Sequence, residues 1–242
     1  ALIGVLSLET GQKKILIEGG MCPRYSPSGH LVYARAGSLL AVPFDVKKLA
    51  VTGQPLPVLE GVFMSASTGM AAFAISASGD LAYAPGPAEA GERLPVWVDR
   101  KGAARPFPLP MRSYLHPRFS PDDRQLAMEI EGPTHDCYFY DIARESLTRF
   151  SFDGTTHWPI WAARGERIAF RSGRTPIMSM WWTPADRSGA DERLTPEEGS
   201  TQSPESSSPD GRALLFTQRN PGMGADIFVL SLDGDRRPRP LV

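Results

Sequence analysis

Short apolar stretches alternate with turn-forming residues along the whole chain, and one such pattern recurs five times. Its copies are PRYSPSGHLVYAR from Pro23, FAISASGDLAYAP from Phe73, PRFSPDDRQLAMEI from Pro117, PIWAARGERIAFRS from Pro159 and ESSSPDGRALLFTQ from Glu205. Successive copies begin about 40 to 50 residues apart, which is typical of β-propeller blades. The pattern therefore predicts a repeat protein built from strands.

Each copy predicts a β-hairpin with a four-residue turn, as in Ser120-Pro121-Asp122-Asp123. Proline presets φ at the second turn position, and Ser or Asp side chains can bond the turn backbone. Glycine usually fills the fourth position because it adopts a left-handed conformation without a steric clash. The third copy has Asp123 instead of this glycine, and the fourth has Ala162-Ala163-Arg164 in place of Ser-Pro-Asp.

A second hairpin follows each first one, so every repeat is expected to be a four-stranded meander with strands A to D. We therefore expect an all-β fold: a β-propeller of four-stranded antiparallel blades, about six in number, with five complete and one half-blade. The expected single domain, 1–242, comprises a half-blade at 1–20 and blades at about 21–60, 61–110, 111–152, 153–196 and 197–242. Leu2–Leu8 and Lys14–Glu18 are expected to be strands C and D of the half-blade. Strands following Val242 in a longer parent protein would complete it, and an incomplete ring would leave an edge prone to self-association.

Composition changes this picture little. The 26 Lys and Arg residues balance 27 Asp and Glu residues, and the formal net charge of −1 gives no reason to expect nucleic-acid binding. No apolar run approaches the roughly 20 residues of a membrane helix, so no membrane insertion is expected within this chain. Cys22 and Cys137 lie far apart in the repeat, which predicts two small buried side chains and no disulfide.

The repeats resemble those of TolB-type, WD-repeat-like propellers. The resemblance lies in turns of the Ser-Pro-Asp-Gly type, in the strand that follows each turn, and in DCYFYD from Asp136 and DIFVLSLD from Asp226. FAISASGDLAYAPG, RLPVWVDRKG and LTRFSFDG further resemble propeller regions at the C-terminus of bacterial serine/threonine protein kinases. This resemblance implies an extracytoplasmic part, periplasmic or at the cell surface, of a larger bacterial protein.

The sequence contains no recognisable catalytic motif, and we expect neither an enzymatic activity nor a cofactor. It has no GxSxG, no HExxH, no phosphate-binding GK[ST] ending and no kinase signature. Asp136 and Asp226 are expected to bond neighbouring turns. Asp99 and Asp141 stand at turn starts, where Asp caps backbone amides. The run from Met178 to Trp182 is expected to pack between blades.

The histidines carry the candidate site. In a meander, D–A and B–C loops share one face, and His116 and His157 are assigned to D–A loops and His135 to the B–C loop between them. Arg171 and Arg174, in the next B–C loop, would lie beside them, whereas His30 occupies an A–B turn on the opposite face. The same face receives two variable loops, Pro85–Arg93 and the Gly-rich Arg219–Ala225.

Imidazole and guanidinium groups on one rim suit a carboxylate, a phosphate or an acidic peptide, with pH sensitivity near the ordinary histidine pKa of about 6.5. No metal site is predicted, although His116, His135 and His157 are weak candidates for metal ligands. The leading interpretation is a non-catalytic sensor or interaction module that binds a protein, a peptide or a small anionic ligand on this face. Two alternatives stay open: the gating propeller of a prolyl-oligopeptidase-like hydrolase, or a small metal-assisted lyase or hydrolase that uses the rim histidines.

Overall fold

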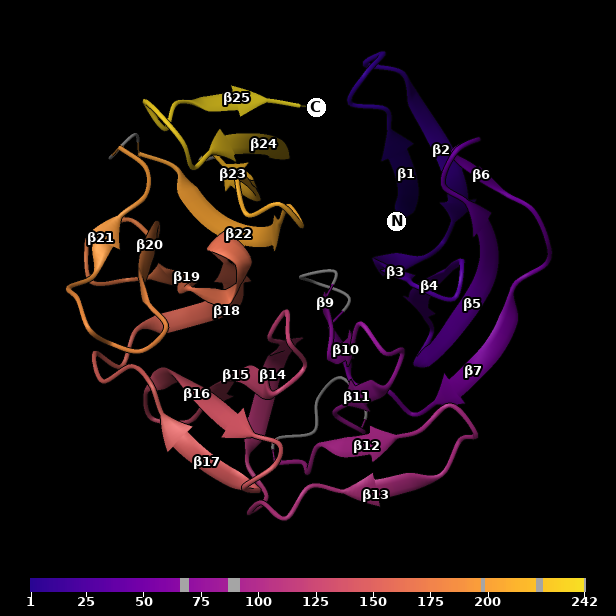
Figure 1. Ribbon diagram of the computed structural model, residues 1–242, viewed down its shortest axis with the longest axis horizontal. Coiled ribbons are helices and arrows are strands. Elements are labelled where there is room, and N and C mark those ends of the chain that lie inside the picture. Colours follow the sequence, from indigo (N-terminus) through magenta and orange to yellow (C-terminus); the bar gives the residue numbers. More distant parts are fainter. Residues whose placement is uncertain (66–69, 87–91, 197–198, 221–223, 242) are drawn as a thin grey trace. The chain divides into compact units, whose positions relative to one another are not determined.

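The computed structural model describes residues 1–65, 70–86, 92–196, 199–220 and 224–241 of the 242-residue chain. These residues form antiparallel β-sheets, and the helical element described is a single 3-10 turn, Ala163–Gly165. Within the described part, no helix is long and apolar enough to cross a bilayer. The chain divides into two compact units, Ala1–Met111 and Arg112–Val242. Strands within each sheet lie in chain order, as Figure 1 shows.

The N-terminal unit begins with a two-stranded sheet, β1–β2, and continues with a five-stranded sheet in which β6 and β7 both pair with β5. A short hairpin, β8–β9, precedes a four-stranded sheet, β10–β13. The strands are β1 (Leu2–Leu6), β2 (Lys13–Glu18), β3 (Met21–Ser26), β4 (His30–Arg35), β5 (Ser38–Asp45), β6 (Ala50–Val51), β7 (Leu56–Glu60), β8 (Met64–Ser65), β9 (Met70–Ala71), β10 (Phe73–Ile75), β11 (Leu81–Tyr83), β12 (Val96–Val98) and β13 (Ala104–Pro106).

The C-terminal unit contains three four-stranded sheets, β14–β17, β18–β21 and β22–β25. The strands are β14 (Ser113–Phe119), β15 (Gln125–Glu131), β16 (His135–Asp141), β17 (Ser146–Arg149), β18 (Thr156–Ala162), β19 (Arg167–Ser172), β20 (Ser179–Pro184), β21 (Glu192–Arg193), β22 (Thr201–Ser207), β23 (Ala213–Arg219), β24 (Ala225–Ser231) and β25 (Pro238–Pro240). The expected all-β fold of four-stranded antiparallel blades, five of them complete, is thus confirmed, and residues 1–20 contribute a two-stranded sheet. The blade limits drawn from the sequence remain a prediction.

The turns between the first two strands of the blades follow the predicted chemistry. In the turn between β14 and β15, the amide of Asp123 donates to the carbonyl of Ser120 at 2.9 Å, and the Ser120 hydroxyl accepts the amide of Gln125 at 2.9 Å. Asp123 is left-handed (φ 57°), as is Gly211 (φ 71°) at the same turn position of the last sheet. The predicted need for a left-handed residue at this position is therefore confirmed.

Two local details differ from the sequence-based expectations. The turn between β18 and β19 lacks the Ser that opens the turn in the other copies and the Pro that three of them have. Three consecutive residues, Ala163, Arg164 and Gly165, take positive φ there. The hairpin β8–β9 was not anticipated because its strands are only two residues long. Two loops expected to vary, Pro85–Arg93 and Arg219–Ala225, lie partly outside the described residues.

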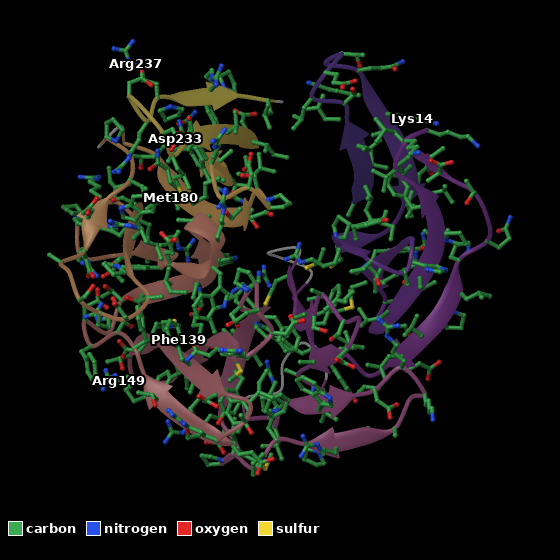
Figure 2. The ribbon with its side chains drawn as sticks, in the orientation of Figure 1. Lys14, Phe139, Arg149, Met180, Asp233 and Arg237 are labelled. Atoms are coloured by element: carbon green, nitrogen blue, oxygen red, sulfur yellow. The ribbon has the colours of Figure 1, made fainter. Side chains whose placement is uncertain are left out.

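Apolar side chains pack between neighbouring sheets of each unit. In the C-terminal unit, one cluster includes Ile160, Met180 and Trp182 of the sheet β18–β21 together with Leu214 and Phe216 of β23. A second cluster combines Phe139 and Phe150 with Trp161, Ile168 and Phe170. Figure 2 labels Phe139 and Met180, one from each cluster. Met180 and Trp182 occupy the inter-blade core, as predicted, and Cys22 and Cys137 are free thiols.

Candidate functional site

Two bulged strands aim polar and aromatic side chains at one place in the C-terminal unit. The pairing of β14 with β15 shifts register between Leu115 and Arg118, and that of β18 with β19 shifts between His157 and Ile160. Inside these bulges His116 and Trp158 have positive φ, 50° and 52°, although each precedes a proline and is not glycine. This conformation is unfavourable for such residues and persists only where the surrounding structure enforces it. Bulges re-aim side chains and backbone groups, and here they bring the imidazole of His116 and the backbone amide of Trp158 to the same carboxylate, that of Glu129.

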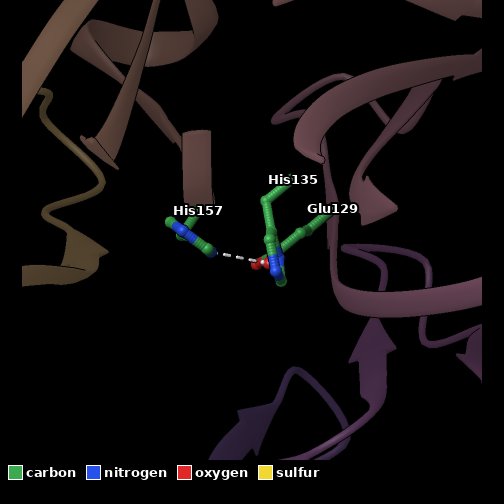
Figure 3. A group of neighbouring side chains, drawn as sticks. All are labelled: Glu129, His135 and His157. Atoms are coloured by element: carbon green, nitrogen blue, oxygen red, sulfur yellow. Dashed lines mark hydrogen bonds and ion pairs between the residues drawn. The ribbon is translucent and has the colours of Figure 1, made fainter. Parts of the chain in front are cut away.

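Glu129 lies at the centre of this group. It belongs to β15 and is 1% exposed. Its Oε1 atom accepts hydrogen bonds from Nδ1 of His135 and Nδ1 of His157, both at 2.9 Å (Figure 3). Its Oε2 atom accepts the backbone amide of Trp158 at 3.2 Å and lies 3.8 Å from Nε2 of His116. We call Glu129, His116, His135 and His157 the Glu129 cluster.

The loops that hold the cluster meet as the meander topology predicts. The amide of His135, at the start of β16, donates to the carbonyl of Gly154 at 3.0 Å, and Gly154 belongs to the connection between β17 and β18. A Cβ atom on Gly154 would lie 3.1 Å from the Thr134 side chain, so the two connections are in close contact. The rings of His135 and His157 pack at 4.3 Å between centroids as a result.

The histidines of the cluster differ in their electrostatics. Burial lowers the pKa of His116 to about 3, against the opposing effect of Glu129, so this ring is neutral near pH 7. The hydrogen bond to Glu129 raises the pKa of His135. Burial acts to raise the pKa of Glu129, but hydrogen bonds from His135 and His157 outweigh it and hold that pKa well below its usual range. The expectation that the rim titrates near 6.5 is therefore wrong for His116.

Arg171 stands beside the cluster. Its guanidinium lies over the Trp158 ring at 4.0 Å, and the other neighbour of that ring is His116, at 4.1 Å between centroids. The Nη1 atom of Arg171 donates to the Ser203 hydroxyl at 3.2 Å. Its Nε atom is buried and has no hydrogen-bond partner among the described residues. A buried guanidinium donor of this kind suits an incoming anion.

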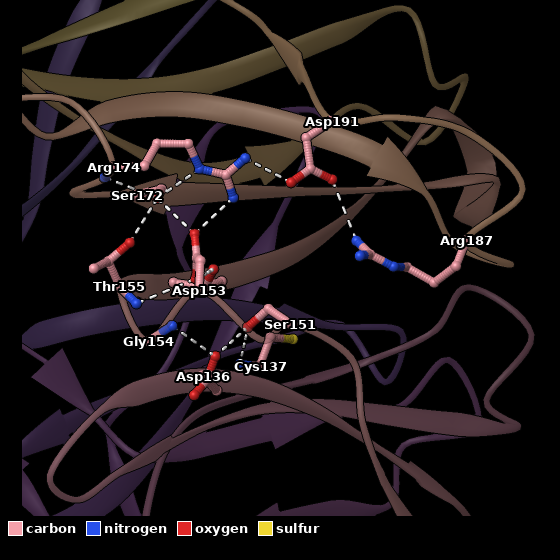
Figure 4. A network of polar contacts seen from close by, with 11 residues as sticks. Asp136, Cys137, Ser151, Asp153, Gly154, Thr155, Ser172, Arg174, Arg187 and Asp191 are labelled. Carbon is pink, nitrogen blue, oxygen red and sulfur yellow. Dashed lines mark hydrogen bonds and ion pairs between the residues drawn. The ribbon is translucent and has the colours of Figure 1, made fainter.

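Arg174 is bonded elsewhere. Its guanidinium binds Asp191 at 2.6 Å and Asp153 at 2.7 Å, and its Nε donates to the Ser172 hydroxyl at 3.1 Å (Figure 4). Asp153 also accepts hydrogen bonds from Thr155 and Thr156, so this network ties the loop before β18 to the loop after β19. The sequence predicted Arg174 beside the three histidines, but the structure bonds it to Asp153, Asp191 and Ser172 instead.

The sequence placed the three histidines in loops, and the structure corrects this. His116 lies in β14, His157 in β18 and His135 at the first position of β16. His116 is 4% exposed and His157 9%, because the bulges turn both rings inward. His30 bonds Ser28 in the turn between β3 and β4, as its assignment to an A–B turn implied.

The aspartates expected to be structural behave unevenly. Asp136 is buried and accepts hydrogen bonds from the Ser151 hydroxyl and the Gly154 amide (Figure 4). It also accepts one from Arg149, and these contacts confirm the turn-bonding role. Asp99 caps the amides of Lys101 and Ala103, and Asp141 caps that of Arg144. Asp226 is exposed at its equivalent strand position.

Glu129 itself was missed at the sequence level. The available signal was a single acidic residue inside the otherwise apolar core of β15, where Leu126, Ala127, Met128 and Ile130 are all buried. A buried carboxylate needs several partners, so such a residue marks a polar cluster. The arrangement offers three potential ligand atoms, one each from Glu129, His135 and His157, all within 4.8 Å of one another.

Comparison with known proteins concerns the fold. No protein-family model matches the chain, and no curated protein matches its sequence. Among solved structures, a putative TolB from Agrobacterium tumefaciens superimposes with a TM-score of 0.80 at 22% identity, over 100% of this chain and 88% of that one. TolB from Acinetobacter baumannii gives 0.76 at 17% identity, over 99% of this chain and 59% of that one. An oligogalacturonate lyase in complex with manganese gives 0.63 at 15% identity, over 98% and 69%.

The antiparallel four-stranded blades, arranged in chain order, define a β-propeller. More particularly, the fold is that of the TolB-type propellers, as the repeat motif indicated.

Proposed function

We propose that the chain is a non-catalytic binding module that takes up an acidic peptide or a small anionic ligand beside the Glu129 cluster. The observation that carries this proposal is the Arg171 guanidinium, held over Trp158, whose buried Nε has no hydrogen-bond partner among the residues that the structure describes. Leaving a buried donor unpaired and keeping two non-glycine residues left-handed both cost folding free energy. A bound anion would satisfy the donor.

The charges near Arg171 are compatible with an anionic ligand. Glu129 already shares its negative charge among two imidazole N–H groups and one backbone amide. The ring of His135 is 31% exposed, and the raised pKa of this residue favours a cationic imidazole. Arg171 and His135 thus present two donors to a carboxylate or phosphate, and such charge-assisted hydrogen bonds are the strong ones.

Binding of a tetraglutamate peptide and of inorganic phosphate to the full chain tests this proposal. Whichever of the two probes binds, Arg171→Gln should weaken its affinity by about 10-fold, which is the effect of losing one charged hydrogen bond. Arg124→Gln is the matched control, because Arg124 is exposed in the turn between β14 and β15, at the opposite end of β15 from Glu129. Equal affinity of both variants, or hydrogen-exchange protection confined to the turns around His30 and Asp122, would contradict the proposal.

The wider setting that we propose is a larger bacterial protein such as a serine/threonine protein kinase, with the propeller outside the cytoplasm. Support comes from the resemblance of the repeats described above. The full reading frame tests it: a kinase and a membrane helix upstream agree with a sensor role, whereas a GxSxG-containing domain downstream would favour a peptidase propeller instead.

A lyase or hydrolase is the second candidate function. Two histidines and a carboxylate within 4.8 Å of one another favour it, and one structural neighbour is an oligogalacturonate lyase in complex with manganese. Incubating the chain with oligogalacturonate and Mn²⁺, and following the unsaturated product by its ultraviolet absorbance, tests this candidate. No product above that of a His157→Ala control would reject lyase activity on this substrate.

A further inference from the structure

The Glu129 cluster brings together two imidazoles and one carboxylate, which are side chains that bind zinc in proteins. Two imidazole nitrogens, Nδ1 of His135 and Nδ1 of His157, converge on the same carboxylate oxygen from two different sheets (Figure 3). We propose that Glu129, His135 and His157 bind one Zn²⁺ ion and leave one coordination position open to a ligand. This inference rests on the proposed function in that it concerns the same binding face.

The distances suit a tetrahedral ion with small adjustments. Zn²⁺ binds imidazole nitrogen at about 2.0–2.1 Å and carboxylate oxygen at about 2.0–2.2 Å, so two ligand atoms of a tetrahedral site lie about 3.4 Å apart. Both Nδ1 atoms are now 2.9 Å from Oε1 of Glu129, and all three donor atoms lie within 4.8 Å of one another. Side-chain shifts on the order of an ångström, which lengthen the two Nδ1–Oε1 distances and draw the most separated donor atoms together, therefore give a site of the right size.

The proton balance is simple. An ionised carboxylate only accepts hydrogen bonds, so each Nδ1 carries a hydrogen in the metal-free arrangement. Zn²⁺ binds the deprotonated Nδ1 lone pair, so each neutral ring must move its proton to Nε2, and a cationic ring must release one proton. The ion then replaces two N–H···O hydrogen bonds with three coordination bonds.

The surroundings supply the partners that orient metal ligands. The amide of Trp158 donates to Oε2 of Glu129 at 3.2 Å, which fixes the carboxylate and leaves Oε1 for the ion. Nε2 of His135 lies 4.0 Å from a carboxylate oxygen of Glu131, so a closer approach of this carboxylate would let it accept a hydrogen bond from Nε2–H of a bound ring. Carboxylate–histidine–zinc arrangements of this kind recur in metal sites.

The donor set also defines what the ion would do. Two histidines and one glutamate are the ligands of zinc sites that keep a fourth position for water or substrate. Of the three ligands, His135 has the most exposed side chain, at 31%, whereas the Glu129 side chain is buried. The open coordination position therefore faces solvent on the side of His135. A carboxylate or phosphate that also contacts Arg171 could occupy this position, which would make the ion an anchor for the anionic ligand.

Titration of the chelator-treated full chain with ZnCl₂ tests the proposal. Isothermal calorimetry should give one Zn²⁺ per chain, and the melting temperature should rise with zinc concentration, because an ion that binds only the folded state stabilises it. His135→Ala and His157→Ala should each lower zinc affinity by about 100-fold or more, since loss of an outer-shell partner alone costs 10–100-fold. Glu129→Gln should do the same. If that variant does not fold, the partly exposed His135 provides the decisive substitution.

Three controls separate this site from adventitious binding. His30→Ala removes the histidine outside the cluster, Cys22→Ser removes the partly exposed thiol, and both variants should bind zinc as the parent chain does. X-ray absorption of the zinc complex should show two imidazole ligands and no sulfur. Three results would each overturn the proposal: absence of stoichiometric zinc binding, unchanged zinc affinity in both His135→Ala and His157→Ala, or a sulfur ligand.

The binding proposal and the zinc proposal can fail separately. Tetraglutamate binding is measured with EDTA and again with one equivalent of Zn²⁺. Zinc binding without any peptide binding would reject the function proposed for the face and keep the metal site. Peptide binding that is identical in EDTA and in zinc, in a chain that takes up no zinc, would reject the metal site alone.

Discussion

Asp123 shows how much one backbone conformation matters. It is left-handed (φ 57°) at a turn position where the other four copies of the motif have glycine. Asp123→Gly should stabilise the fold by about 0.5–1 kcal/mol, because relief of the left-handed strain exceeds the entropy that glycine adds to the unfolded chain. Urea unfolding of both proteins measures the difference. An equal or lower midpoint would contradict the turn assignment.

The candidate site could be predicted in part at the level of residues. Register counting alone brought His116, His135 and His157 to one face, because a meander fixes which loops meet. Glu129 was not predicted, since its role depends on which strand faces the bulged histidines in space. The inward turn of His116 was also missed, because the sequence shows a His-Pro dipeptide but not the left-handed φ of 50° that aims its ring.

At the scale of elements, one indole joins two neighbouring sheets. Nε1 of Trp161, in β18, donates to the carbonyl of Arg118, in β14, at 3.0 Å. Trp161→Phe should cost about 1–3 kcal/mol, because it leaves a carbonyl short of a partner and shrinks a buried ring. Urea unfolding monitored by far-UV circular dichroism gives the value.

Trp181 provides the matched control for this measurement. Its Nε1 is buried with no hydrogen-bond partner in the described part of the chain. Trp181→Phe therefore removes an unpaired donor and should change stability far less than Trp161→Phe. A larger loss at Trp181 than at Trp161 would show that ring size, and not the hydrogen bond, decides both results.

The network around Asp153 links two loops and predicts a pH dependence. Burial acts to raise the pKa of Asp153, but hydrogen bonds from Thr156 and Thr155 and the charge of Arg174 lower it overall. Because the folded-state pKa lies below the unfolded value of about 3.9, the ionised group stabilises the fold above that pH, and this contribution disappears as pH falls through the folded value.

Asp153→Asn tests that dependence. At pH 7 it should cost about 1 kcal/mol, a figure reduced for the solvent screening of a partly exposed ion pair. The gap between the variant and the parent chain should close as the pH falls below about 4. Thermal melts from pH 7 down to pH 3 follow this gap, with exposed Asp226→Asn as the control. A gap that stays constant with pH would contradict the role given to the charge.

The fold was more predictable than the site, because the turns that join the strands carry local sequence signals. Each turn that opens with Ser and has Gly or Asp at its fourth position encodes its own geometry locally, so the hairpins joined by these turns could be predicted from sequence. The turn between β18 and β19 lacks that code, and its three successive left-handed residues were not foreseen. The hairpin β8–β9 was missed because two-residue strands carry too little alternation to detect.

On the scale of the molecule, the strands of the sheet β1–β2 pair only with each other among the described residues, as do the shorter strands of β8–β9. Unpaired edges invite pairing with another chain. The chain should therefore form dimers at high concentration. Leu2→Lys should shift the equilibrium toward monomer, because Leu2 is 63% exposed on β1. Light scattering after size exclusion measures the mass. Met111→Lys, at an exposed position outside the strands, is the control, and a parent chain that is monomeric at every concentration would contradict the expectation.

The left-handed residue before proline also has a consequence for how such a propeller can diversify. That position holds Cys22 in β3, His116 in β14 and Trp158 in β18, with φ of 52°, 50° and 52°. Proline and the bulge fix the backbone conformation there. The side chain can therefore be a thiol, an imidazole or an indole while the path of the strand stays the same. Three of the blades thus carry one position of this kind, and each of the three holds a different side chain. A new binding specificity could therefore be introduced by single substitutions at these positions, without any change to a loop.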